Sequence, residues 1–155
     1  MILHFLLSLF LLQAPDSLSR AKPVQQNISG WQADSLSARK TVECFIRSYE
    51  SGDKTATLYV YYTGPHVNDM GGTPEELEKE LLPAELSKNR KNPAEATLKS
   101  LRYEAESKYK EPVFYAEYLS RNKIHSLCLH KINGNWKVDL SFLWMGDWYD
   151  WMPGY

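Results

Sequence analysis

The chain has 155 residues, enough for one domain with additional segments. Its apolar content of 43% and charged content of 24% are those of an ordinary globular protein. The formal net charge is −1 and there is no basic run, so no electric field attracts nucleic acid. These properties exclude nucleic-acid binding from the expected functions and favour a globular fold.

The first twelve residues form an uncharged, apolar run. A helix that crosses a bilayer needs about 20 residues, so this run fits the apolar part of a secretory leader better than a membrane anchor. Cleavage after Ala14 or Ala21 is compatible with the sequence, and we favour Ala21. The alternative is an ordinary core helix. In such a helix apolar residues alternate with polar ones, and in this run they do not. We therefore expect a signal peptide over residues 1–21, an exported protein (periplasmic or secreted) and no stable membrane anchor.

A polar, flexible lead-in is expected over residues 22–35, followed by a helix over residues 38–51 that ends before Gly52. The helix has one apolar stripe at three- and four-residue spacing, made of Val42, Phe45, Ile46 and Tyr49. This spacing predicts a helix with one buried face.

Three further segments precede the sheet. The apolar run at residues 58–62 fits a short strand or a second helix, and its pattern does not decide between them. Residues 73–76 (Thr-Pro-Glu-Glu) predict a capped helix start, and we expect that helix to be interrupted at Pro83. A similar start at residues 92–95 predicts a short third helix.

From about residue 99 to residue 143 the apolar residues follow a period of two, which predicts strands. Four strands are expected, at residues 99–109, 112–120, 123–132 and 136–143. The predicted turns lie at Lys110-Glu111, Arg121-Asn122 and Asn133-Gly134, of which the last is the strongest hairpin signal. The resulting fold class is α+β, a curved four-stranded antiparallel meander packed on two or three helices in a cone-shaped roll over residues 36–143.

The two-residue turns set the register of these strands. They place Leu129 opposite Val138, and Tyr118 opposite both His125 and Tyr103. One face then collects apolar side chains that pack on the helices, and the other collects polar ones that face solvent. The expected polar face includes Arg102, Glu104, Glu106, Glu117, Ser126, Cys128, His130, Lys137, Asp139 and Ser141.

Within the apolar face, four side chains form a row across the predicted sheet. They are Tyr103, Tyr118, His125 and Phe142. With Tyr49 of the helix they are the candidates for a ligand pocket, since pockets combine apolar walls with a few polar groups. The alternative is that these polar groups bond each other or a helix end. No Asp or Glu falls on this face, so the usual general base is missing from it.

The order of elements carries a resemblance. A helix followed by Tyr-Glu-Ser-Gly-Asp (residues 49–53), a middle helix and a meander ending in Gly-Asn-Trp-Lys-Val (residues 134–138) resembles the nuclear-transport-factor-2-like superfamily of cystatin-like cones. The similarity is greatest to its small exported bacterial members of uncharacterised function. It implies a bent sheet that wraps helices around a pocket. Members include isomerases, dehydratases, binding modules and immunity proteins, so the fold leaves function open.

The two cysteines and the tail offer additional candidates. In an oxidising compartment Cys44 and Cys128 are a possible disulfide, although their predicted faces do not obviously meet, and they are too few for a zinc motif. No cofactor motif is present, and we expect neither a metal nor a cofactor. The aromatic tail, residues 144–155, either folds back on the domain or forms a surface for a partner or a second copy, which would give a homodimer. The candidates for that surface are Trp144, Trp148, Tyr149 and Trp151.

The leading hypothesis is a non-enzymatic, exported binding or interaction protein that takes a small apolar ligand or a protein partner. The carboxylate-free sheet face motivates it. One alternative is a small enzyme of the isomerase or dehydratase type that uses His125 with Tyr118. Another is an immunity-type module that binds a protein.

Overall fold

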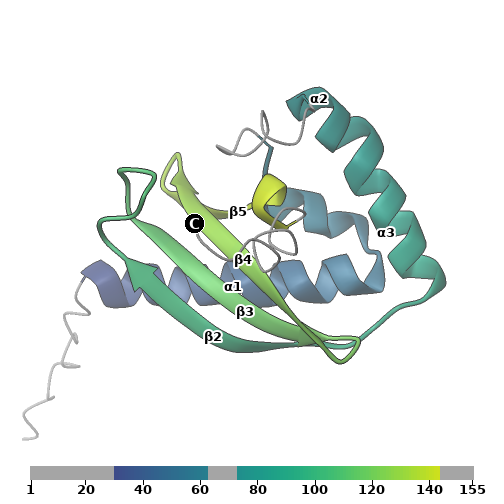
Figure 1. Ribbon diagram of the computed structural model, residues 1–155, viewed down its shortest axis with the longest axis horizontal. Coiled ribbons are helices and arrows are strands. Elements are labelled where there is room, and N and C mark those ends of the chain that lie inside the picture. The colour runs from purple at the N-terminus through teal and green to yellow at the C-terminus, as the bar shows by residue number, and fades with distance from the viewer. Residues whose placement is uncertain (1–29, 63–72, 144–155) are drawn as a thin grey trace, which may run out of the picture.

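The computed structural model describes residues 30–62 and 73–143. The predicted signal peptide, most of the lead-in and the aromatic tail with Trp144, Trp148, Tyr149 and Trp151 lie outside the described residues. The described part is α+β, with several helices and one five-stranded, mostly antiparallel sheet (Figure 1).

Helix α1 runs over Gly30–Ser51 and buries the predicted stripe. It begins well before the expected start at Ala38, because its first turns are anchored to the sheet. The carboxylate of Asp34 accepts hydrogen bonds from Lys131 Nζ at 2.7 Å and from Trp136 Nε1 at 3.4 Å. The helix ends at Ser51 as predicted, just before Gly52, whose φ of +72° is the left-handed conformation that commonly terminates a helix.

The undecided run after α1 is a 3₁₀-helix, η1 (Lys54–Tyr59), followed by the short strand β1 (Val60–Tyr61). Asp53 caps η1 by accepting a hydrogen bond from Thr55 N at 2.9 Å. Strand β1 pairs in parallel with β5, with Val60 opposite Val138. The sheet therefore has a fifth strand that the predicted meander lacked.

The next helical segment consists of α2 (Pro74–Glu76), the π-helical turn η2 (Leu77–Leu81) and α3 (Leu82–Lys91). The predicted capping box at Thr73 and Glu76 is confirmed, with its two hydrogen bonds at 2.8 and 3.2 Å. The expected interruption at Pro83 is wrong. A proline lacks the N–H that an α-helix requires, and here a π turn precedes it while the helix continues. The prediction of a short third helix at residues 92–95 is also wrong, because the chain enters strand β2 at Ala96.

The antiparallel part of the sheet consists of β2 (Ala96–Glu104), β3 (Val113–Ser120), β4 (Lys123–Ile132) and β5 (Asn135–Asp139). The strand order is β1-β5-β4-β3-β2. The predicted registers of β3 with β4 and of β4 with β5 are confirmed, with Tyr118 opposite His125 and Leu129 opposite Val138. Both turns have two residues at positive φ, the conformation that matches the twist of a hairpin.

Two registers differ from the prediction. Tyr103 lies opposite Phe114 instead of Tyr118, because the connection between β2 and β3 spans residues 105–112 and is longer than two residues. The displacement is even, so the predicted faces are retained. At the other end β5 stops at Asp139 and residues 140–143 form a helical turn, so Phe142 does not extend the ladder opposite His125.

Figure 1 shows α1 across one face of the sheet and α3 beyond one end of the strands. The apolar face packs on α1 as expected, with Leu127, Leu129 and Val138 fully buried. The opposite face is not uniformly solvated, which corrects the prediction for its residues Cys128, His130, Asp139 and Ser141, all buried. No helix among the described residues is long and apolar enough to span a membrane.

Gly52 provides a test of the packing between α1 and α3. A Cβ atom at this residue would lie 2.3 Å from Arg90 N and 2.4 Å from Leu86 O, so Gly52→Ala forces two backbones apart. We expect it to lower the free energy of unfolding by about 3 kcal/mol in urea denaturation. Gly134→Ala is the matched control, because Gly134 also has a positive φ but nothing near its Cβ position. Gly134→Ala should lower the free energy of unfolding by about 1 kcal/mol. If both variants lost the same amount of stability, the steric explanation would be contradicted.

Candidate functional site

A pocket of about 300 Å³ lies where α1, α3 and the turn between β3 and β4 meet. This turn approaches the C-terminal end of α3 (Figure 1). The lining residues come from all three elements and from the turn after β5, namely Tyr49, Glu50, Glu85, Lys88, Asn89, Asn92, Tyr118, Arg121, His125 and Leu143. The volume is at the lower end of the range for small-molecule sites.

Glu50 is the central charged group of the pocket. It belongs to the last turn of α1 and is only 3% exposed. One of its carboxylate oxygens accepts a hydrogen bond from the Tyr118 hydroxyl at 3.1 Å, and the other accepts one from Arg121 Nε at 3.3 Å. Arg121 also donates to the Asn89 side chain at 3.3 Å and to the Asn92 carbonyl at 2.6 Å. One arginine therefore ties α1, α3 and the turn together.

Both charged partners occupy unfavourable places. The Glu50 carboxylate lies near the C-terminus of a helix, where the helix dipole disfavours a negative charge. Arg121 adopts a φ of +51°, a left-handed conformation that costs a non-glycine residue about 1–2 kcal/mol. Their ion pair and its hydrogen bonds offset these costs, so the turn is held by its arginine side chain.

His125 lies beside this network. Its ring stacks on Tyr118 with centroids 4.9 Å apart, so the two side chains touch face to face. The His125 Nε2 atom is buried and has no hydrogen-bond partner among the described residues. A buried polar atom of this kind is costly unless something satisfies it. Among the described residues that line the pocket, Nε2 of His125 is the buried side-chain polar atom that lacks a partner.

The structure brings together three of the five predicted pocket residues. Tyr49, Tyr118 and His125 line the pocket. Tyr103 instead packs on Phe114 and is 40% exposed, and Phe142 contacts Tyr115 on the other face of the sheet. Both departures follow from the longer β2–β3 connection and the early end of β5.

Sequence reasoning missed Glu50 and Arg121. A signal for Glu50 was present, because it follows Val42 and Ile46 at four-residue spacing and so extends the buried stripe of α1. Glu50 lies on α1 and not on the sheet face from which a carboxylate is missing. Arg121 occupies a predicted turn, and nothing in the local pattern shows that its side chain reaches back to two helices.

A second group of polar side chains lies on the face of the sheet away from α1. Its centre is His130, 1% exposed, whose Nδ1 lies 2.6 Å from Glu111 Oε1 and whose Nε2 lies 3.4 Å from Asp139 Oδ2. Cys128 Sγ lies 3.6 Å from the same Nε2. The rings of Tyr61 and Tyr109 contact the imidazole, with centroids 6.2 and 5.1 Å away. We call His130, Glu111, Asp139 and Cys128 the outer-face cluster.

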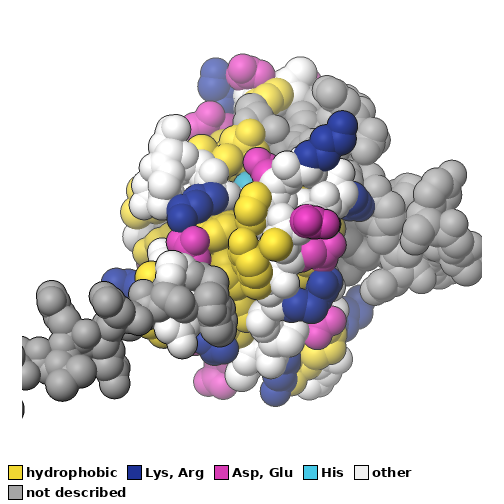
Figure 2. Space-filling view, turned by 90° about the vertical axis from the view of Figure 1, so that its left-hand side faces the viewer, with side chains coloured by type: hydrophobic (Ala, Val, Ile, Leu, Met, Phe, Trp, Pro, Cys, Tyr) yellow, Lys and Arg dark blue, Asp and Glu magenta, His cyan; other side chains and the backbone are white. Residues whose placement is uncertain are grey.

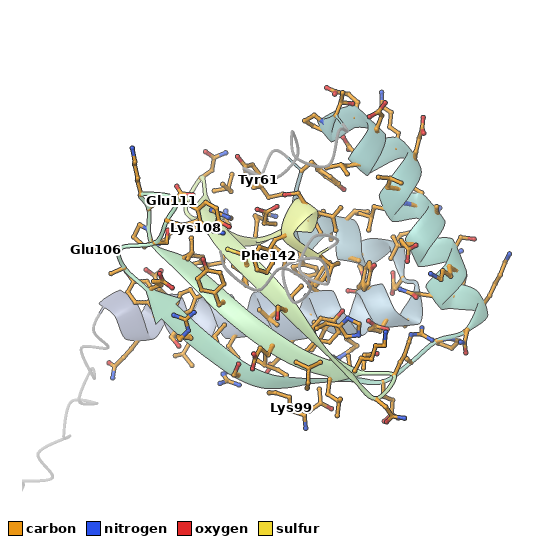
Figure 3. The ribbon with its side chains drawn as sticks, in the orientation of Figure 1. Tyr61, Lys99, Glu106, Lys108, Glu111 and Phe142 are labelled. Atoms are coloured by element: carbon orange, nitrogen blue, oxygen red, sulfur yellow. The ribbon has the colours of Figure 1, made fainter. Side chains whose placement is uncertain are left out.

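Figure 3 shows Tyr61, Lys108, Glu111 and Phe142 at the same end of the sheet, away from Lys99. The side of the molecule seen in Figure 2 has a band of hydrophobic side chains flanked by acidic and basic ones. Tyr61 of β1 and Tyr109 and Glu111 of the β2–β3 connection contact His130 and cover this cluster.

The electrostatics of this cluster favour a charged imidazole and a protonated thiol. Burial alone lowers the pKa of His130, but its contacts with Asp139 and Glu111 outweigh burial and raise that pKa above its ordinary value. Burial and the nearby Asp139 carboxylate strongly raise the pKa of Cys128. The order Cys128–His130–Glu111 resembles a nucleophile with its base and orienting carboxylate, yet the thiol is fully buried and stays protonated, so it is not an activated nucleophile.

The possible disulfide is not formed, since Cys44 and Cys128 are both free. Cys44 is on α1, and Cys128 is on β4 beside His130, on the sheet face away from α1. Within residues 30–62 and 73–143 no three His, Cys, Asp or Glu side chains are arranged to hold a metal ion.

Comparisons with protein families, curated proteins and solved structures found no match to this chain. The resemblance to the nuclear-transport-factor-2-like superfamily therefore stays a prediction, and function has to be argued from the geometry of the two groups of side chains.

The Glu50–Arg121 pair is testable by a double-variant cycle. Arg121→Met leaves a buried carboxylate without its cation and should lower the free energy of unfolding by about 2 kcal/mol, less than for a fully buried pair because Arg121 is partly exposed. In a protein that already carries Glu50→Gln, Arg121→Met should lower the free energy of unfolding by clearly less, because no buried carboxylate is left unpaired. Lys123→Met, next to this turn and exposed, is the control and should change stability by under about 0.5 kcal/mol. Additive effects of the two pocket changes would refute the coupling.

The outer-face cluster predicts a pH dependence of stability. The folded-state pKa of His130 is raised, so its contribution is complete below the unfolded value of about 6.5 and is lost as pH rises through the folded value. Urea unfolding between pH 5.5 and pH 9 should show this decline. Glu111→Gln removes one carboxylate from the imidazole and should flatten it, while Glu106→Gln, an exposed change in the same connection, should not. Identical slopes for both variants would contradict the assignment.

Proposed function

We propose that this protein is an exported, non-enzymatic binding protein whose pocket takes a small, uncharged and largely apolar molecule. The observation that carries the proposal is the pairing of charges among the residues that line the pocket. The buried Glu50 is paired with Arg121 at 3.3 Å, and Glu85 is paired with the largely exposed Lys88 at 3.7 Å. A charged ligand would have to break one of these pairs or remain uncompensated in a partly enclosed site. An uncharged ligand leaves both pairs intact.

The expected polar contact of such a ligand is a single hydrogen bond. Of the described pocket atoms, His125 Nε2 is buried and without a partner. The ring of Tyr49 and the side chain of Leu143 supply apolar walls. A hydroxyl-bearing aromatic or alicyclic molecule would satisfy the imidazole and cover these walls, which fits the general composition of small-molecule sites.

The arrangement supports binding over acid–base catalysis. An enzyme using His125 with Tyr118 needs the phenol within hydrogen-bond reach of the reacting atom. Here the Tyr118 hydroxyl donates to Glu50, and its ring is stacked on His125. Glu50 is also a poor candidate for a general base, since Tyr118 and Arg121 each occupy one of its oxygens.

The cone-shaped architecture is part of the same proposal. In the superfamily that the chain resembles, a bent sheet and helices enclose a pocket. The placement of this pocket between α1, α3 and the β3–β4 turn is compatible with such an enclosure. Export rests on the predicted leader.

The test uses three probes of similar size, namely benzyl alcohol, benzylamine and benzoate. Ligand-observed NMR with the full chain should show saturable binding of the alcohol and at least tenfold weaker binding of both ions, because only the ions disturb the paired charges. His125→Leu should weaken binding of the alcohol about fivefold, the value of one hydrogen bond. Ile124→Ala, an exposed change next to it on β4, should leave binding unchanged. Preference for either ion, or no binding of any probe, would refute the proposal.

A further inference from the structure

The carboxylate of Asp139 holds the turn that follows β5. Asp139 is fully buried, and its Oδ1 accepts hydrogen bonds from Ser141 N at 3.0 Å, from Ser141 Oγ at 2.5 Å and from Phe142 N at 3.4 Å. These donors belong to the helical turn at residues 140–143. One oxygen atom therefore fixes the start of this turn, in the way an N-cap residue fixes the start of a helix.

The other oxygen of Asp139 faces His130. Oδ2 has no hydrogen bond of good geometry and lies 3.4 Å from His130 Nε2, while Glu111 occupies Nδ1 at 2.6 Å. A protonated imidazole has one N–H for each carboxylate. A neutral imidazole keeps a single N–H, and the shorter contact assigns it to Glu111. The Nε2 lone pair then faces the buried Asp139 carboxylate, and the negative charge of that carboxylate has no positive partner. This is a costly arrangement.

The same turn reaches the pocket on the other face of the sheet. Leu143 lines the pocket, and Leu140 is fully buried in the core. The turn is thus connected at its start to the outer-face cluster and at its end to the pocket wall. Its position depends on Asp139, and the state of Asp139 depends on the charge of His130.

We propose that the charge on His130 regulates the ligand pocket through Asp139 and the turn at residues 140–143. The inference rests on the proposed binding function for its biological meaning. With His130 charged, Asp139 is compensated, the turn is held and Leu143 closes the pocket wall. With His130 neutral, Asp139 is uncompensated, the turn loosens and affinity falls. His130 loses its charge as pH rises, so affinity decreases with rising pH, and the raised pKa of His130 places this decrease above the ordinary value of about 6.5.

The groups that face His130 in the described part of the chain come from four elements. They are Asp139 of β5, Cys128 of β4, Tyr61 of β1, and Glu111 and Tyr109 of the β2–β3 connection. Burial strongly raises the pKa of Cys128, so its thiol stays protonated. His130 is the group of the cluster whose ordinary pKa, about 6.5, lies near neutral pH, and its contacts with Asp139 and Glu111 raise that pKa.

The first experiment measures binding of benzyl alcohol at pH 5.5 and pH 9. The wild-type affinity should fall about fivefold at the higher pH, a coupling at the low end of those usual between two sites. Asp139→Asn keeps an oxygen for the turn and places an amide N–H opposite a neutral His130 Nε2. Its affinity should be independent of pH and within twofold of the wild-type value at pH 5.5. Glu117→Gln, an exposed change on β3, is the control and should retain the wild-type fall.

The second experiment needs neither a ligand nor a variant. The Leu143 methyl signals of the full chain should shift with pH in step with the His130 ring signals, with the same midpoint. Methyl signals that do not follow His130, or an Asp139→Asn variant that keeps the wild-type pH dependence, would overturn the inference. Failure of all three probes to bind would refute the binding function alone, because the methyl titration tests the coupling without a ligand.

Discussion

A carboxylate buried at the end of α1 is the constraint on which the pocket depends. Glu50 lies at the negative end of a helix dipole, away from water, and such a charge is tolerated only if it is paired and hydrogen-bonded. Arg121 and Tyr118 supply these contacts from the sheet. Since the same arginine also binds Asn89 and the carbonyl of Asn92, the stable state of Glu50 requires α1, α3 and the β3–β4 turn to be in place together. The pocket lies where these elements meet.

The sheet separates two chemically different environments. Toward α1 it presents a continuous apolar surface with Phe114, Leu127 and Val138. On the opposite face it buries His130 with Asp139 and Cys128, under cover from β1 and the β2–β3 connection. Buried ionised groups need partners, and each carboxylate of this cluster has the imidazole as its partner. The turn after β5 is the element that touches both environments, and it therefore links a proton on one face to a cavity on the other.

Local signals predicted much of the fold. Asn133-Gly134 specified the β4–β5 hairpin because a type I′ turn needs two residues that tolerate positive φ. Thr73 and Glu76 specified a helix start because each satisfies the other's free N–H. The predicted extra helix at residues 92–95 failed, because the same proline signal also fits a chain entering an edge strand. Lys110-Glu111 was too weak a turn signal to show that the β2–β3 connection extends over residues 105–112.

The sequence by itself determined which faces of the helix and strands are apolar, because burial selects residues at fixed periods of 3.6 and 2. It thereby placed Tyr49, Tyr118 and His125 on buried surfaces, and these three line the pocket. Only the tertiary structure decided which polar groups share a site. Glu50 and Arg121 are 71 residues apart, and Glu111 and His130 meet because a long connection returns to the sheet. Side-chain contacts of this kind depend on where elements pack in space, and no local period in the chain encodes that.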